Sequence, residues 1–222
     1  MSNTVLIIGS SGSGKSTSIR NLDPKSTFII SVLDKPLPFK GFKKLYKPIS
    51  GWDDKEGNYY QSDDWQRVIR CIKMVNDHRP EITTLIIDDA HFLMANEFMH
   101  RATEKGFERF SEIAQHMWFV MSTITGSRPS LTCFVLSHNE LDNAGVSKPK
   151  TVGKLLEDKI TLEAMVTTVL HTVIKDNEYK FLTQHDGSHV SKSPMGLFDT
   201  NFIDNDLKMV KEKIELYFNE GE

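Results

Sequence analysis

The residues with the most specific chemistry lie near the start of the sequence. The segment Gly9–Ser16 reads GSSGSGKS, which places two glycines, a lysine and a hydroxyl at the spacing G-x-x-x-x-G-K-S. Glycines let successive backbone N–H groups converge on phosphate oxygens, a lysine reaches the β- and γ-phosphates, and the last hydroxyl is a ligand for Mg²⁺. The pattern therefore predicts a nucleoside-triphosphate site. Its predicted phosphate-binding residues are Gly9, Ser10, Ser11, Gly12, Ser13, Gly14, Lys15, Ser16 and Thr17.

The surroundings of this loop support that interpretation. The apolar, β-branched run Thr4–Ile8 predicts a buried strand before it, and a helix is expected from about Lys15 to Leu22. The amino end of such a helix would add positive potential at the phosphates. The alternative is a glycine-rich turn with a solvated lysine, which the strand–loop–helix context disfavours.

A second apolar run ends in two carboxylates. Thr83–Ile87 predicts a strand, and Asp88 and Asp89 follow it directly. Asp88 is expected to hold the Mg²⁺ shell together with Ser16. Asp89 is a candidate for orienting or deprotonating the attacking water, and the alternative is that it caps the next helix.

Another predicted buried strand, Leu131–Leu136, ends in Ser137-His138-Asn139. Ligands of open parallel sheets bind at the carboxyl ends of the strands, so a polar residue here can contact the γ-phosphate. His138 is the stronger candidate and Asn139 the other. A loop histidine without a role is the alternative.

The order of the elements predicts the fold class. Buried strands, including Thr27–Val32, alternate with helical patterns, which is typical of a mainly parallel α/β sheet flanked by helices. Two runs around Lys175-Asp176-Asn177 then predict antiparallel strands, and an amphipathic helix over about residues 204–218 closes the chain. One domain over residues 1–222 is expected.

Composition excludes several classes of protein. The 222 residues are 39% hydrophobic and 26% charged, with a net charge of −3. No apolar run is long enough for a membrane helix, no signal peptide is expected, and the two isolated cysteines favour a reducing cytoplasm. No membrane partner is expected. The net charge argues against nucleic-acid binding by bulk charge, but a local basic groove could still bind nucleic acid.

Several features together resemble a known family. Besides Gly9–Ser16 and Asp88, they are Lys35-Pro36-Leu37-Pro38-Phe39-Lys40-Gly41, Ser137-His138 and Ser191-Lys192-Ser193-Pro194. From about Val5 to Phe198 the chain resembles the phage-encoded RecA-core ATPases that act as short single-strand-annealing recombinases. The resemblance implies a RecA-like P-loop core with C-terminal antiparallel strands, DNA-stimulated ATP hydrolysis with Mg²⁺, and a function in DNA recombination. The location would then be the bacterial host cytoplasm.

The resemblance also implies roles for particular residues. His138 would sense the γ-phosphate, and the loop Asn139–Leu156, with Lys148, Lys150 and Lys154, would contact DNA. Lys192 would reach the ATP of a neighbouring subunit. The implied partners are single-stranded DNA and further copies of the chain, and a single-strand-binding protein is another candidate.

Two departures from the family pattern leave questions open. The sequence begins at the first core strand, so the segment through which RecA-type proteins polymerise is not expected, and self-assembly is a hypothesis. The catalytic glutamate of RecA follows the second core strand, where the nearest acid here is Asp34. Asp34 and Asp89 both remain candidates for activating water.

The segment Lys35–Lys47 is basic and aromatic. Phe39, Lys40 and Lys43 suit single-stranded DNA, because lysines neutralise phosphates and aromatic rings stack on bases. The alternative is a surface loop whose aromatic residues fold inward as an anchor. Two further functions also remain: a P-loop ATPase that acts on a protein partner without touching DNA, and a small-molecule kinase, which the absence of an arginine-rich lid disfavours.

Overall fold

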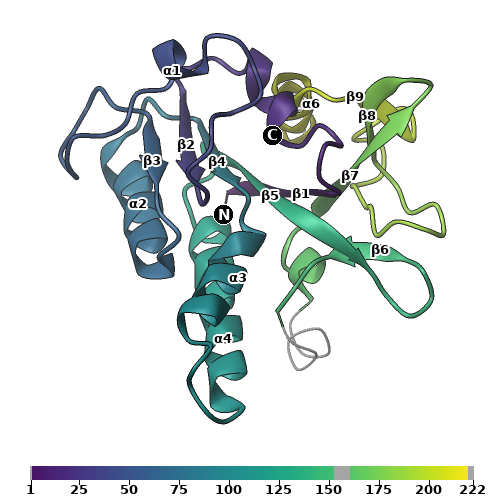
Figure 1. The fold of residues 1–222 in the computed structure, drawn as a ribbon. Helices are drawn as coiled ribbons and strands as arrows, with labels where there is room; N and C mark the ends of the chain where they lie inside the picture. Colours follow the sequence, from purple (N-terminus) through teal and green to yellow (C-terminus); the bar gives the residue numbers. More distant parts are fainter. Residues whose placement is uncertain (1, 153–160, 220–222) are drawn as a thin grey trace.

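The computed structural model describes residues 2–152 and 161–219 (Figure 1). Its elements are β1 (Asn3–Gly9), η1 (Ser16–Asn21), β2 (Thr27–Ser31), α1 (Phe42–Leu45), β3 (Tyr59–Gln61), α2 (Trp65–His78), β4 (Thr84–Asp88), α3 (His91–His100), α4 (Glu108–Thr125), β5 (Thr132–Leu141), β6 (Ser147–Pro149), η2 (Leu162–Met165), β7 (Thr168–Lys175), β8 (Glu178–Leu182), β9 (Phe202–Asp204) and α6 (Leu207–Asn219).

The strands form one mixed sheet in the order β3-β2-β4-β5-β1-β7-β8-β9, with β6 paired to β5. The pairs from β3 to β7 are parallel, and β8, β9 and β6 add antiparallel pairs. The expected α/β class, with a mainly parallel sheet and a C-terminal antiparallel extension, is confirmed. Strand β5 lies between β1 and β4, so it separates the two strands that carry the loop Gly9–Ser16 and Asp88.

Helices cover both faces of the sheet, which explains why its central strands are apolar on both sides. Helices α2, α3 and α4 lie against one face, while η1, α1 and α6 lie against the other (Figure 1). Along β1, Leu6 and Ile8 pack with the first group, and Val5 and Ile7 pack with the second. The alternation fixes the register of β1 and hence the position of the loop that follows it.

Some expected boundaries are wrong. The helix predicted over Lys15–Leu22 is a six-residue 3₁₀ helix, Ser16–Asn21. The segment after Leu136 is not all loop, because β5 continues to Leu141 and forms a hairpin with β6. After β8 the chain first makes two single-bridge contacts, Ser147 with His189 and Val169 with Lys192, before β9 begins.

The amino end of α2 is capped by a side chain. Asp64 is the capping residue, and its carboxylate accepts hydrogen bonds from the backbone N–H groups of Gln66 and Arg67. Asp63 instead accepts from the side chain of Asn96. In the described part of the chain, no helix combines the length and apolar character needed to cross a membrane.

Candidate nucleotide-binding site

The loop Gly9–Ser16 leaves the carboxyl end of β1 and turns over the end of the sheet. Gly14 has a φ of 98°, a left-handed conformation that glycine adopts without strain. A Cβ at Gly9 would lie only 1.9 Å from the Thr172 hydroxyl of β7, so no larger residue fits there. Ser13 Oγ lies 2.5 Å from the same hydroxyl, which joins the loop to β7.

Lys15 is folded back over this loop. Its Nζ donates hydrogen bonds to the carbonyl oxygens of Gly9 at 2.8 Å and Ser10 at 2.9 Å, and the residue is only 6% exposed. Burial lowers the pKa of Lys15 to about 8, although the carboxylates of Asp89 and Asp88 act in the opposite direction. A buried ammonium held by two carbonyls can gain strongly from an anionic ligand.

Ser16 and Asp88 are in direct contact, close enough to share one Mg²⁺ ion. Ser16 Oγ donates to the two carboxylate oxygens of Asp88 at 2.8 Å and 3.0 Å. Asp88 is fully buried at the end of β4, and burial, reinforced by the nearby charge of Asp89, raises its pKa to about 6. Bringing a cation beside this carboxylate would therefore relieve an unfavourable charge.

The donor set fits Mg²⁺. Within residues 2–152 and 161–219, no group of three or more histidine, cysteine, aspartate or glutamate side chains gathers as a metal site. Mg²⁺ in nucleotide sites does not need such a group, since it keeps several waters and takes one or two protein oxygens plus phosphate oxygens. The Ser16 hydroxyl and the Asp88 carboxylate supply those protein oxygens.

Asp89 is held between two basic side chains. Its Oδ2 lies 2.5 Å from Lys35 Nζ, and its Oδ1 lies 3.4 Å from His138 Nε2. Burial acts to raise the pKa of Asp89, but the contacts with His138 and Lys35 outweigh it and the pKa is lowered. The alternative that Asp89 caps α3 is wrong, because the N-cap is Ala90 and no side chain caps that end.

His138 reaches the site because β5 is inserted beside β1. In the register of the two strands, His138 lies opposite Gly9, where the phosphate loop begins. The ring also packs edge-on against Phe92 of α3, with the ring centroids 5.6 Å apart. Asn139, the other candidate on this strand, donates instead to the hydroxyl of Ser147 at 2.6 Å. The geometry therefore favours His138 as the polar residue beside the phosphates.

Asp34, the other candidate for activating water, lies in different surroundings. It is exposed and lines a cavity of about 320 Å³ together with Lys43 and Tyr59. Asp89 is buried beside His138, whereas Asp34 is open to solvent. The arrangement favours Asp89.

The aromatic residues of the Lys35–Lys47 segment point into the protein. Phe42 and Tyr46 are buried in the core on the α6 side, and Phe39 is partly buried against them, 6.0 Å from the Phe42 ring. Lys40 and Lys43 are exposed. This arrangement favours the anchor interpretation over base stacking by Phe39.

Two lysines of the predicted DNA-contacting loop lie together at the β5–β6 hairpin, and Lys192, which was predicted to reach a neighbouring subunit, lies elsewhere. Lys148 is in β6, and Lys150 follows it and donates its backbone N–H to the carbonyl oxygen of His138 at 2.8 Å. Lys154 falls outside the described residues. Lys192 is exposed, and its backbone pairs with Val169 of β7.

Three residues of this region were not identified from the sequence: Lys35 as a partner of Asp89, and His171 and Thr172 of β7. The last two line a groove of about 570 Å³ beside Ser10–Ser13 and Ser147. Burial, reinforced by the neighbouring His189, lowers the pKa of His171 to about 3. Nothing in the sequence around β7 marks it as a wall of the site, since its pairing with β1 depends on the whole sheet order.

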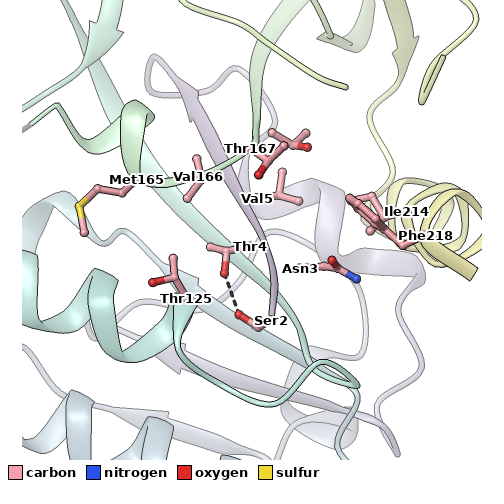
Figure 2. Close-up of a pocket in the computed structure, with 11 residues that line it drawn as sticks. Ser2, Asn3, Thr4, Val5, Thr125, Met165, Val166, Thr167, Ile214 and Phe218 are labelled. Carbon is pink, nitrogen blue, oxygen red and sulfur yellow. Dashed lines mark hydrogen bonds between the residues drawn. The ribbon is translucent and has the colours of Figure 1, made fainter. Parts of the chain in front are cut away.

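A cavity at the opposite, amino end of β1 does not suit a phosphate. It has a volume of about 250 Å³ and lies between Ser2–Val5, Met165–Thr168 and α6 (Figure 2). None of the described residues that line it is charged. The candidate nucleotide site is therefore the one at the carboxyl end of β1.

Comparison with known proteins adds no family. No protein-family model matches the sequence, and no curated protein matches it with significant similarity.

Proposed function

We propose that the chain is a Mg²⁺-dependent ATPase with a RecA-like P-loop core. The observation that carries this proposal is the contact of Ser16 with Asp88 across β1 and β4, beside the buried ammonium of Lys15. A glycine-rich loop alone would not place a hydroxyl, a carboxylate and a lysine from two strands at one point. The inserted position of β5, which brings His138 beside the loop, supports the RecA-like assignment.

Each residue has a distinct task in this proposal. The backbone N–H groups of the loop and Lys15 bind the phosphates, and Ser16 and Asp88 hold Mg²⁺, which neutralises charge that develops on the transferred phosphoryl group. Asp89 is placed to orient or deprotonate water, and His138 lies beside it. Because η1 is a short 3₁₀ helix, the helix dipole contributes less here than the loop and Lys15 do.

Replacing Lys15 tests the phosphate site. Lys15→Ala is expected to weaken Mg-ATP binding at least about hundredfold and to abolish phosphate release, since charge-assisted bonds to phosphate are lost. Calorimetry measures the binding, and phosphate release measures turnover. Lys25→Ala is the matched control, because Lys25 is exposed just before β2, at the opposite end of the sheet. Near-normal turnover in Lys15→Ala would contradict the assigned site.

We further propose that the ATPase acts on single-stranded DNA. The family resemblance suggests this partner, and one contact gives it a structural rationale. The backbone N–H of Lys150, next to the hairpin, donates a hydrogen bond to the carbonyl oxygen of His138 at the site. A change in the position of either residue can therefore shift the other. An ATPase that acts on a protein partner is the competing function, and binding of DNA separates the two.

A further inference from the structure

Lys35 is a cation of the site that the phosphate motif does not include. It follows β2 and places its Nζ 2.5 Å from Asp89, and β2 is the neighbour of the strand that carries Asp88. The Lys35 side chain is 44% exposed, whereas that of Asp89 is 2% exposed. The ammonium therefore contacts a buried carboxylate, although nearly half of the lysine side chain is exposed to solvent.

Asp89 is fixed more firmly than its partner. Its backbone has a φ of 62°, an uncommon left-handed conformation for a residue other than glycine. Its second oxygen is already near His138, and the N–H of Ala90 is bonded to the carbonyl oxygen of Leu136 in β5. If one member of the Lys35–Asp89 pair moves, it is the lysine.

The pair lies within the charge cluster of the phosphate site. Asp88 adjoins Asp89 in the sequence, and Ser16 is bonded to it. The charges of Asp89, Asp88 and Lys35 all act on the pKa of Lys15, and the charges of Asp89, Lys35 and Lys15 act on the pKa of Asp88, so these four side chains form one charge cluster. A triphosphate at this site brings more negative charge than a single carboxylate, and a half-exposed lysine can exchange one anion for the other.

We propose that Lys35 is a contact for the γ-phosphate, which it binds in place of Asp89. Without nucleotide, Lys35 is paired with Asp89. With ATP bound, its ammonium donates to a γ-phosphate oxygen, and the Asp89 carboxylate keeps His138 as its neighbour. ADP lacks the γ-phosphate and leaves the Lys35–Asp89 pair intact, so Lys35 makes the site prefer ATP over ADP. This inference rests on the proposed ATPase function.

The experiment compares two ligands by calorimetry in the presence of Mg²⁺: ADP and the non-hydrolysable β,γ-imido analogue of ATP. Lys35→Ala is expected to lower the ratio of analogue affinity to ADP affinity about tenfold, as one charge-assisted bond to phosphate is lost. ADP binding itself should change little, which separates this variant from Lys15→Ala. Lys35→Arg should restore most of the ratio, and Lys25→Ala, at the other end of β2, should leave it unchanged.

A second variant tests the exchange of partners. Asp89→Asn removes the carboxylate that competes for Lys35 and is expected to raise the analogue-to-ADP ratio by several-fold. Asparagine tolerates the left-handed backbone at this position, so the turn after β4 should be kept.

The outcomes are distinguishable. If the wild-type protein binds neither ligand, the proposed ATPase function fails, and the inference fails with it. If it binds both, but the ratio is the same in Lys35→Ala, then Lys35 is only a surface partner of Asp89 and the inference alone is overturned. A lowered ratio in Asp89→Asn would show that Asp89 positions Lys35 for the phosphate, which would overturn the exchange.

Discussion

At the scale of single residues, the site concentrates negative charge in a buried position. Asp88 is fully buried, Asp89 follows it, and the nearest hydrogen-bond donor to Asp88 is the neutral hydroxyl of Ser16. The cost of burying this carboxylate is reflected in its raised pKa. Under the proposed function, bound Mg²⁺ offsets the cost that folding incurs at this carboxylate.

Asp88→Asn is therefore expected to stabilise the protein in the absence of Mg²⁺ and nucleotide. Asp88 has a folded-state pKa above its unfolded value, so its ionisation destabilises the fold as pH rises. The difference in unfolding free energy between Asp88→Asn and the wild type should grow between about pH 4 and about pH 6 and then level off. An increase of ~1–2 kcal/mol in the free energy of unfolding corresponds to a rise of about 2–8 °C in the melting temperature of a domain of this size.

Thermal unfolding in EDTA across this pH range measures the effect. The exposed Asp53→Asn variant is the control for removing one negative charge far from a buried site. The same Asp88→Asn protein should lose the stabilisation that Mg-ATP gives to the wild type. A variant that is less stable than wild type at pH 8 would show that the buried carboxylate contributes favourably to the apo fold.

At the scale of elements, the β5–β6 hairpin joins the candidate nucleotide site to the segment that we propose contacts DNA. Strand β5 lies between β1 and β4 and includes His138. Its last residues, up to Leu141, pair with β6. Lys148 lies in β6 and Lys150 just beyond it. The hairpin is thus an extension of a strand whose inner part forms the wall of the site.

Single-stranded DNA is expected to bind at this hairpin. The wild-type protein should bind a labelled single-stranded oligonucleotide more tightly with Mg-ATP, and more tightly than a duplex of equal length. The double variant Lys148→Ala/Lys150→Ala should bind single-stranded oligonucleotides of every base sequence more weakly than the wild type does. It should also reduce the slope of log affinity against log salt by roughly 0.7 for each lost phosphate contact.

Fluorescence anisotropy at several salt concentrations provides the measurement, with Lys73→Ala on the exposed side of α2 as the control. An unchanged salt slope in the double variant would contradict the hairpin as the DNA contact. No binding of either DNA by the wild type would favour a protein partner instead.

The elements also show which features the sequence predicts well. The apolar runs of β1, β2, β4 and β5 and the phosphate loop could be identified because each is a local pattern. The hairpin after Leu136 could not, because the Asn139–Gly153 stretch has the glycine, proline and lysine content of a loop. Its pairing depends on contacts such as Asn139 with Ser147. The Lys35–Asp89 pair was missed for a similar reason: it joins residues 54 positions apart through the adjacency of β2 and β4.

At the scale of the whole molecule, helices cover both faces of the sheet, so the carboxyl ends of its strands are where a ligand can bind. Gly9, Asp88 and His138 all lie at this edge, on three adjacent strands. The groove beside Ser10–Ser13 continues across the edge to β7. Lys192 is bridged to β7 through its backbone at Val169 and exposes its side chain, as a residue that reaches another copy of the chain must do.

Lys192→Ala is accordingly expected to impair turnover only where copies of the chain assemble. Phosphate release measured over a range of protein concentrations, beside light scattering for the assembly state, tests this. The wild type should gain specific activity as it assembles, and the variant should not. Lys208→Ala, on the exposed face of α6, is the control. An equal loss of activity in the dilute monomer would contradict a role across subunits.

The bond from the Lys150 N–H to the His138 carbonyl has a practical consequence. This hydrogen bond joins β5, the strand beside the phosphate loop, to the segment that follows the hairpin. The exchange of this amide proton with solvent therefore reports on both places at once, without any label attached to either. A movement of His138 on nucleotide binding and a movement of the hairpin on binding of single-stranded DNA would both change the exchange rate of this one amide proton, in the unmodified protein.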